Sequence, residues 1–220
     1  MWTRRLRAIV ILGGVVMFDS CRHSSGGAAL NEELRAELVA MDDHDQAVRA
    51  ELAADGPYPG GYHPRMAAVH DSNAARLREI IHEYGWPTTA LVGLDGTKAA
   101  HRIAQHSINH PDFMRECRSL IMAAGDRGEI PRDQFAYIDD RIRVYEGLPQ
   151  LYGTQWHGGV DGIEPHPVDD WNAVNQRRRA LGLPTLDEMR PKRSERLSQE
   201  EVDRIRTEEL AWRRRVGWVR

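Results

Sequence analysis

Residues 31–54 read NEELRAELVAMDDHDQAVRAELAA. Their apolar positions recur at alternating steps of four and three residues, a spacing that places side chains along one face of an α-helix. Asn31 is a residue type that caps the free backbone N–H groups at a helix start. The stretch therefore predicts a long amphipathic helix, whose inward face carries Leu34, Leu38, Met41, Asp45, Val48 and Leu52.

Asp45 is the polar exception on this apolar face. Burying a carboxylate without a partner costs several kcal/mol or shifts its pKa, so Asp45 needs a cation or hydrogen-bond donors. Arg49, one helical turn later, is the nearest candidate in the sequence. A second predicted helix, over residues 66–84, repeats the exception with Asn73 among apolar positions. Such groups must be satisfied internally or by a ligand.

The remainder of the chain also has helical patterns. A third helix is expected over residues 97–109, a fourth from Pro111, a fifth from Pro131 and a sixth over residues 170–181. No β-hairpin signal or sequence repeat is apparent. The sequence therefore predicts an all-α fold, a compact domain of about six helices with a long polar loop before the last core helix.

Composition and charge narrow the class of protein. Of the 220 residues, 41% are hydrophobic and 29% charged, which is ordinary for a soluble globular domain. A net charge of -3, with no long basic run in the middle of the chain, gives no reason to expect nucleic acid as a partner. We expect one helical domain over residues 30–189 and a charged C-terminal helix within residues 190–220, where Ser198 and Glu201 have the spacing of a capping box.

Residues 1–29 are expected to form a leader and tether. A basic stretch, eleven apolar residues and then DSC have the layout of a secretory signal. With Cys21 after Ser20 the leader resembles a bacterial lipoprotein signal, although Phe18 and Asp19 depart from that pattern. The resemblance implies lipidation at Cys21 and a membrane-anchored protein of the cell envelope. The alternative is a cytoplasmic protein translated from Met17.

Acid–base chemistry is the first candidate activity. His106 lies at a helix edge, and Asp45, Asp139 and Asp140 are available to orient it. A carboxylate on one imidazole nitrogen leaves the other free as a general base near neutral pH. The alternative is a structural histidine that bonds a backbone carbonyl at a helix junction. His106, His110 and His101 are the nearest metal pattern, but they do not form a recognisable ligand set, so no metal site and no cofactor is predicted.

Anion recognition is the second candidate. Arg49, Arg76 and Arg141 lie near the polar positions of the predicted helices. A half-buried arginine offers a rigid fork of donors to a carboxylate or phosphate. The alternative is that these arginines form ion pairs within the protein.

Five segments of the chain carry a family resemblance. They are DDHDQAVR, DSNAARLREIIHEYGWPT, IAQHSINHPDF, AYIDDRIRVYEGLPQLYGTQ and RRRALGLPTL. Together they resemble a bacterial family of unknown function, number sixty-six twenty-four, over residues 30–189, through the ordered set GWPT, QH, DR and YGTQ. The resemblance implies a helical domain and no particular reaction. The positions that match the family pattern are Asp45, Gln46, Arg49, Asn73, Trp86, Pro87, Gln105, His106, Asp140, Arg141, Gln150, Tyr152, Gly153, Thr154 and Gln155.

We therefore predict a polar pocket between the helices and the YGTQ loop. Its predicted catalytic residues are His106, Asp140 and Asp45. Its predicted ligand-binding residues are Gln105, Arg141, Arg49, Asn73, Gln150, Tyr152, Thr154 and Gln155. Three functions remain open: a hydrolase or transferase with His106 as general base, a non-catalytic module that binds a small polar or anionic ligand, and a structural or interaction domain whose polar residues form an internal network.

Overall fold

A computed structural model describes residues 30–54, 62–189 and 196–220. These residues form eight helices and one small two-stranded sheet, so the predicted all-α class is confirmed. The leader, with the expected lipidation site Cys21, lies outside the described residues. Within the described ranges, no helix combines the length and apolar character that crossing a bilayer requires.

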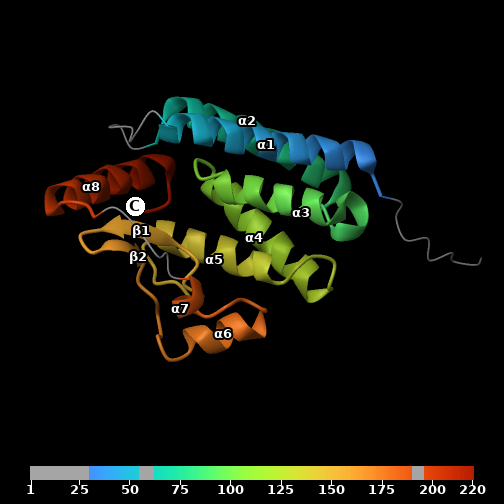
Figure 1. Cartoon of the computed structure of the whole chain (residues 1–220). Helices are drawn as coiled ribbons and strands as arrows, with labels where there is room; N and C mark the ends of the chain where they lie inside the picture. Colours follow the sequence, from blue (N-terminus) through green and yellow to red (C-terminus); the bar gives the residue numbers. More distant parts are fainter. Residues whose placement is uncertain (1–29, 55–61, 190–195) are drawn as a thin grey trace, which may run out of the picture.

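Five helices build the core. They are α1 (Glu32–Ala54), α2 (Pro64–Tyr84), α3 (Thr89–His106), α4 (Pro111–Asp126) and α5 (Asp133–Tyr145). α1 packs along α3 and α2, and α4 packs along α5. In Figure 1, α1 and α2 lie on one side of α3, while α4 and α5 lie on its other side. One apolar cluster runs through all five helices.

The predicted inward face of the first helix is confirmed. Leu34, Leu38, Asp45 and Val48 are all buried, and Asn31 Oδ1 accepts the backbone N–H of Leu34 at 3.0 Å as the expected N-cap. Burial of these apolar side chains against α3 and α2 holds the helix in place. The same packing carries Asp45 into the interior.

The predicted bounds of the third helix were wrong at both ends. The helix begins at Thr89, because Thr88 caps it through its side chain, and it continues through a kink at Gly93. It ends at His106, where Ser107 leaves helical geometry and its hydroxyl donates to the carbonyl of Ile103. His106 is therefore the last helical residue, at a junction between elements.

The predicted absence of a β-hairpin was also wrong. β1 (Trp156–Gly159) pairs antiparallel with β2 (Gly162–Pro165), and Gly159 lies opposite Gly162. Strands of four residues are too short to show a clear alternation of apolar and polar residues in the sequence. The hairpin lies within the long loop that follows α5 and packs against the last helix.

Three helices complete the described chain: α6 (Val174–Ala180), α7 (Leu186–Met189) and α8 (Gln199–Val216). The sixth helix begins later than predicted, because Asp170 Oδ1 accepts the N–H groups of Asn172 and Ala173 in a preceding turn. The predicted capping box of Ser198 and Glu201 at the start of α8 is confirmed.

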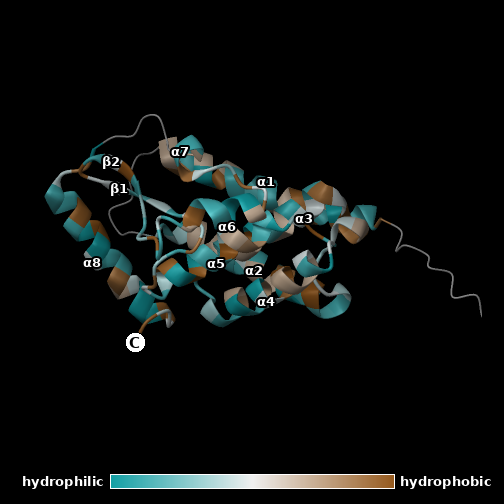
Figure 2. Ribbon diagram, turned by 90° about the horizontal axis from the view of Figure 1, so that it is seen from below, coloured by the Kyte–Doolittle hydropathy of each residue, from teal (hydrophilic) through white to brown (hydrophobic). Residues whose placement is uncertain are grey.

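α8 is docked onto the helical core. The indole N–H of Trp212 donates to Asn109 Oδ1 at 3.1 Å, and that of Trp218 donates to the carbonyl of Ile108 at 2.7 Å. Both rings belong to the main apolar cluster. Figure 2 shows α8 at one edge of the molecule, with a largely hydrophilic ribbon. The C-terminal helix is therefore amphipathic, and Trp212 within it and Trp218 just after it attach it to the core.

Candidate functional site

Three ionisable side chains from three helices meet inside the bundle. Asp45 comes from α1, His70 from α2 and His106 from the end of α3. Asp45 Oδ2 lies 2.8 Å from His106 Nδ1 and 2.9 Å from His70 Nε2. The two imidazole rings have centroids 4.8 Å apart. All three side chains are at least nine-tenths buried, so the group forms a polar centre in an apolar interior.

The helix faces explain why these residues meet. Asp45 lies on the buried face of α1, and His70 shares a buried face of α2 with Met66, Asn73 and Leu77. α1 packs against both α2 and α3. The apolar packing of the three helices therefore forces their polar residues together.

Burial and the short distance between the side chains set the protonation states of Asp45 and His106. Burial alone would raise the pKa of Asp45, but the imidazoles of His106 and His70 outweigh it and lower the pKa on balance. Burial lowers the pKa of His106 to about 4, against the opposing effect of Asp45. Near neutral pH the site thus holds an ionised carboxylate beside a neutral His106 imidazole.

Two further side chains orient the cluster. The phenol oxygen of Tyr62 lies 2.5 Å from His70 Nδ1. Gln46 Nε2 donates to Asp45 Oδ1 at 2.9 Å, which leaves Oδ2 for the imidazoles. Burial raises the pKa of Tyr62, so its phenol stays protonated.

Arg141 connects this cluster to the loop after α5. Its Nη1 donates to the carbonyl of Gln105 at 3.0 Å, and its Nε donates to Gln155 Oε1 at 2.9 Å. Its positive charge adds to the lowering of the pKa of His106. Arg141 makes no ion pair with a carboxylate of the described residues, so its charge is available to a ligand.

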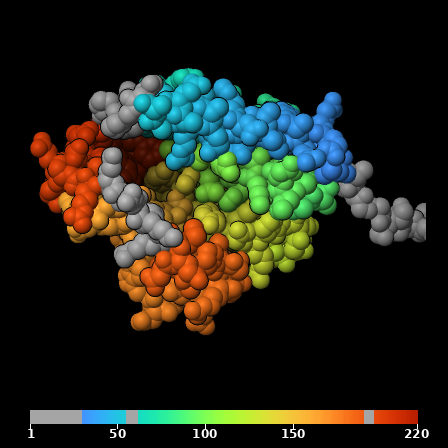
Figure 3. Space-filling model, in the orientation of Figure 1, coloured from blue at the N-terminus to red at the C-terminus, as the bar shows by residue number. Residues whose placement is uncertain are grey.

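A cavity of about 1030 Å³ adjoins the cluster. α5, the hairpin and α8 supply most of its wall, and Figure 3 shows the hollow between α1, α8 and the hairpin. Tyr62 and Arg141 both line it. Tyr62 contacts His70, and Arg141 donates to the carbonyl of Gln105, the residue before His106, so two residues of the cavity wall lie next to the buried cluster.

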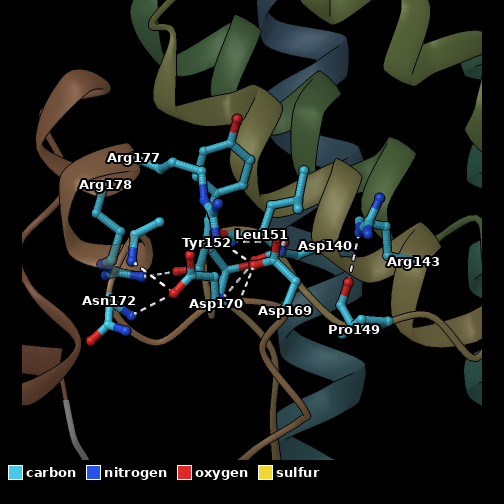
Figure 4. Close-up of polar contacts among 12 residues, drawn as sticks. Asp140, Arg143, Pro149, Leu151, Tyr152, Asp169, Asp170, Asn172, Arg177 and Arg178 are labelled. Carbon is cyan, nitrogen blue, oxygen red and sulfur yellow. Dashed lines mark hydrogen bonds and ion pairs between the residues drawn. The ribbon is translucent and has the colours of Figure 1, made fainter.

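Asp140 does not take part in this cluster. Its oxygens accept the backbone N–H groups of Leu151 and Tyr152 at 2.8 and 3.1 Å (Figure 4). They also accept the backbone N–H and the hydroxyl of Thr154 at 2.9 and 3.0 Å. The prediction that Asp140 belongs with His106 in the catalytic group is therefore corrected. Asp140 anchors the YGTQ loop, because its acceptor sites are used by that loop.

Gln150 completes the anchor. Its side chain is fully buried, donates to the carbonyls of Gln155 and His166 at 3.0 and 2.8 Å, and accepts the N–H of Gln155 at 2.7 Å. The carbonyl of Tyr152 accepts from Arg178 Nη1 at 2.6 Å. The polar groups of Gln150 and Thr154 are thus used inside the protein, whereas Gln155 faces the cavity.

Two other predicted residues lie apart from the cluster. Arg49 is exposed on α1 and forms no ion pair with Asp45, so its predicted role as the partner of Asp45 was wrong. The partners of Asp45 are instead the imidazoles of His70 and His106. Asn73 donates to the carbonyl of Met41 at 3.4 Å. His101 and His110 bond Gln134 and Asp71 instead of joining His106.

A family model described as "Family of unknown function (DUF6624)" matches residues 32–195. The chain belongs to DUF6624. No curated protein and no solved structure has detectable similarity to it. The matched region of this DUF6624 protein contains Asp45, His70, His106 and Arg141, so the whole cluster lies within the family domain.

Sequence reasoning missed two residues of the candidate site in this chain. His70 had a usable signal, since Met66, His70, Asn73 and Leu77 follow the same steps of four and three residues that identified Asp45. Tyr62 had none, because it lies in the loop before α2, where no periodicity constrains it. In the described part of the chain, Asp45, His70 and His106 are the group able to hold a metal ion, with one ligand atom each within 4.8 Å of one another.

Proposed function

We propose that this protein is a hydrolase, or a transferase with a hydroxyl acceptor, in which His106 is the general base and Asp45 orients it. The observation that supports it is the buried 2.8 Å contact between Asp45 Oδ2 and His106 Nδ1. This contact leaves His106 Nε2 without a hydrogen bond to the described residues. A neutral imidazole held in this way can take a proton from water, and the carboxylate stabilises the imidazolium that forms.

The substrate in this proposal carries an anionic group. Arg141 places on the cavity wall a positive charge that has no carboxylate partner among the described residues, with Gln155 beside it. A guanidinium fork binds carboxylates and phosphates through paired hydrogen bonds. A cavity of about 1030 Å³ suits a small molecule, and its apolar side chains, such as Tyr145 and Trp212, can pack against the rest of the ligand.

A second candidate is a binding module without catalysis, which Arg141 and the cavity would serve equally well. His106→Ala separates the two. The test measures release of nitrophenol from a panel of nitrophenyl carboxylic esters, phosphate monoesters and phosphate diesters. We expect the wild-type protein and the exposed control variant His82→Ala to hydrolyse at least one class, and His106→Ala to lose this activity.

Thermal stabilisation by inorganic phosphate or acetate supplies the readout for binding. In a binding module, His106→Ala keeps this stabilisation, Arg141→Ala loses it, and no variant hydrolyses any ester. Hydrolysis by His106→Ala at the wild-type rate would exclude the general-base role.

A further inference from the structure

The buried cluster contains a histidine that the proposed general-base chemistry does not use. His70 is only 7% exposed, and its Nε2 lies 2.9 Å from Asp45 Oδ2. Despite this short distance, Nε2 has no hydrogen-bond partner of acceptable geometry among the described residues. A buried nitrogen that lies beside a carboxylate without a hydrogen bond to it is costly, unless a ligand satisfies it.

The three side chains have the composition of a metal site. Each offers one ligand atom, and the three atoms lie within 4.8 Å of one another. Neutral imidazoles with one carboxylate suit zinc and similar transition-metal cations, whereas magnesium and calcium prefer oxygen ligands alone. Three protein ligands with an open position are typical of catalytic zinc sites, and four protein ligands of structural ones.

We propose that Asp45, His70 and His106 bind one divalent transition-metal cation of the zinc type, with water in the remaining position. The site is built before the cation arrives, because α1, α2 and α3 fix all three residues through their apolar packing. Charge also favours it, since the acidic side chain of Asp45 is 1% exposed and forms no ion pair with an arginine or lysine of the described residues.

The surrounding residues supply the support that metal ligands require. Metal-ligating histidines almost always bond a second partner through their other ring nitrogen, which fixes the tautomer. Tyr62 takes this position at 2.5 Å from His70 Nδ1, so that Nε2 is the nitrogen left for the cation. Gln46 holds Asp45 Oδ1 at 2.9 Å and leaves Oδ2 as the ligand oxygen.

The catalytic role of this cation rests on the proposed hydrolase function. The binding of the cation by the three side chains does not depend on that function. A zinc-type cation lowers the pKa of its bound water, so the metal-bound hydroxide replaces His106 as the base and His106 becomes a ligand. The anionic substrate is still held by Arg141 on the cavity wall. The reaction is still the hydrolysis or transfer proposed above. The metal site adds a cofactor, and it makes the metal-bound hydroxide the nucleophile.

The test uses the untagged full chain, stripped of metal by dialysis against a chelator. Calorimetric titration with zinc alone measures stoichiometry and affinity, and titration with cobalt(II) alone reports the ligand field through its visible absorption. We expect one cation per chain and a cobalt spectrum of low coordination number. His70→Ala and Asp45→Asn should lose both signals, while His82→Ala, an exposed histidine on the same helix as His70, should keep them.

Tyr62→Phe keeps all three ligands and should weaken zinc binding by about 10- to 100-fold. His70→Gln provides a second variant of similar size in case His70→Ala fails to fold, with circular dichroism as the check on folding. Absence of saturable binding by the wild-type protein would overturn the proposal. Equal binding by folded His70→Gln or Asp45→Asn would do the same.

Ester hydrolysis separates this inference from the proposed function. If the cation binds as expected and no ester is hydrolysed with or without it, the metal site stands and the hydrolase fails. If the metal-free protein hydrolyses esters at the full rate and binds no cation, the hydrolase stands with His106 as its base and the metal site fails.

Discussion

Asp45 Oδ2 and His106 Nδ1 lie 2.8 Å apart although 61 residues separate them in the chain. The contact joins α1 to the end of α3, and His70 reaches the same oxygen from α2. This one buried carboxylate therefore lies against two imidazoles, and its removal should affect folding as well as chemistry.

Asp45→Ala should lower the free energy of unfolding by about 1–3 kcal/mol, because it leaves the buried His106 imidazole without its hydrogen-bond acceptor. Urea unfolding followed by circular dichroism measures the change. Asp43→Ala, at the exposed neighbouring position of the same helix, is the control and should change stability by about 0.5 kcal/mol or less. Equal effects at the two positions would show that the Asp45 contacts do not stabilise the fold.

Asp140→Asn should destabilise the protein without affecting the buried cluster. The asparagine amide would place its N–H groups against N–H donors of the YGTQ loop. The free energy of unfolding should therefore fall by about 1.5–3 kcal/mol. Zinc affinity and the rate of ester hydrolysis should stay near wild type in the folded variant, since Asp140 contacts neither imidazole. A variant of full stability that lost hydrolysis would instead restore Asp140 to the catalytic group.

Gly153→Ala should also disturb the loop, through the backbone. Gly153 has φ +66°, and an added Cβ would lie 2.6 Å from Leu186 Cδ2. We expect the free energy of unfolding, measured by heat or urea, to fall by about 1–3 kcal/mol. Gly128→Ala is the matched control, with φ +70° and no atom within 4 Å of the added Cβ. A loss as small as that of the control would mean that Leu186 moves aside without cost.

Helix periodicity predicted the parts of the site that lie on long helices. Asp45 was found because the steps of four and three residues in α1 continue on both sides of it, and apolar burial then determines which way it points. His106 was found by its chemistry, but its position as the last residue of α3 depends on Thr88 and Ser107, whose capping roles only the packed structure reveals.

The partners of these residues depend on tertiary contacts, which periodicity does not encode. Arg49 was the nearest cation to Asp45 in sequence, yet packing of α1 against α2 and α3 supplied His70 and His106 instead. Asp140 was placed with His106 because it was an available carboxylate on another predicted helix. The loop after α5 took its oxygens, since buried backbone N–H groups in an irregular segment need acceptors.

Acid should destabilise the protein through His101. Burial lowers the pKa of His101 from 6.5 to about 3, so the folded protein holds it neutral while the unfolded chain protonates it. The stability that depends on the neutral form is complete above about pH 6.5 and is lost as the pH falls toward about 3, by about 1.4 kcal/mol per pH unit.

His101→Gln isolates this effect, because glutamine can donate to the carbonyl of Gln134 without titrating. Urea midpoints at about pH 8 and about pH 5 should differ less in the variant than in the wild-type protein. Identical pH dependence in both proteins would show that His101 does not contribute to acid unfolding.

Trp218→Ala should detach the end of the chain that follows α8. The Trp218 ring is 4% exposed, lies 5.2 Å from the Tyr145 ring and donates to the carbonyl of Ile108 at 2.7 Å. Truncation of Trp218 should lower the free energy of unfolding by about 3–5 kcal/mol. Trp171→Ala, at a residue that is 59% exposed, should lower it by about 0.5 kcal/mol or less. Because α8 supplies one wall of the cavity, the thermal stabilisation by phosphate or acetate should fall in Trp218→Ala and persist in Trp171→Ala. Unchanged stabilisation in a destabilised Trp218→Ala protein would place the anion away from α8, on the Arg141 side of the cavity alone.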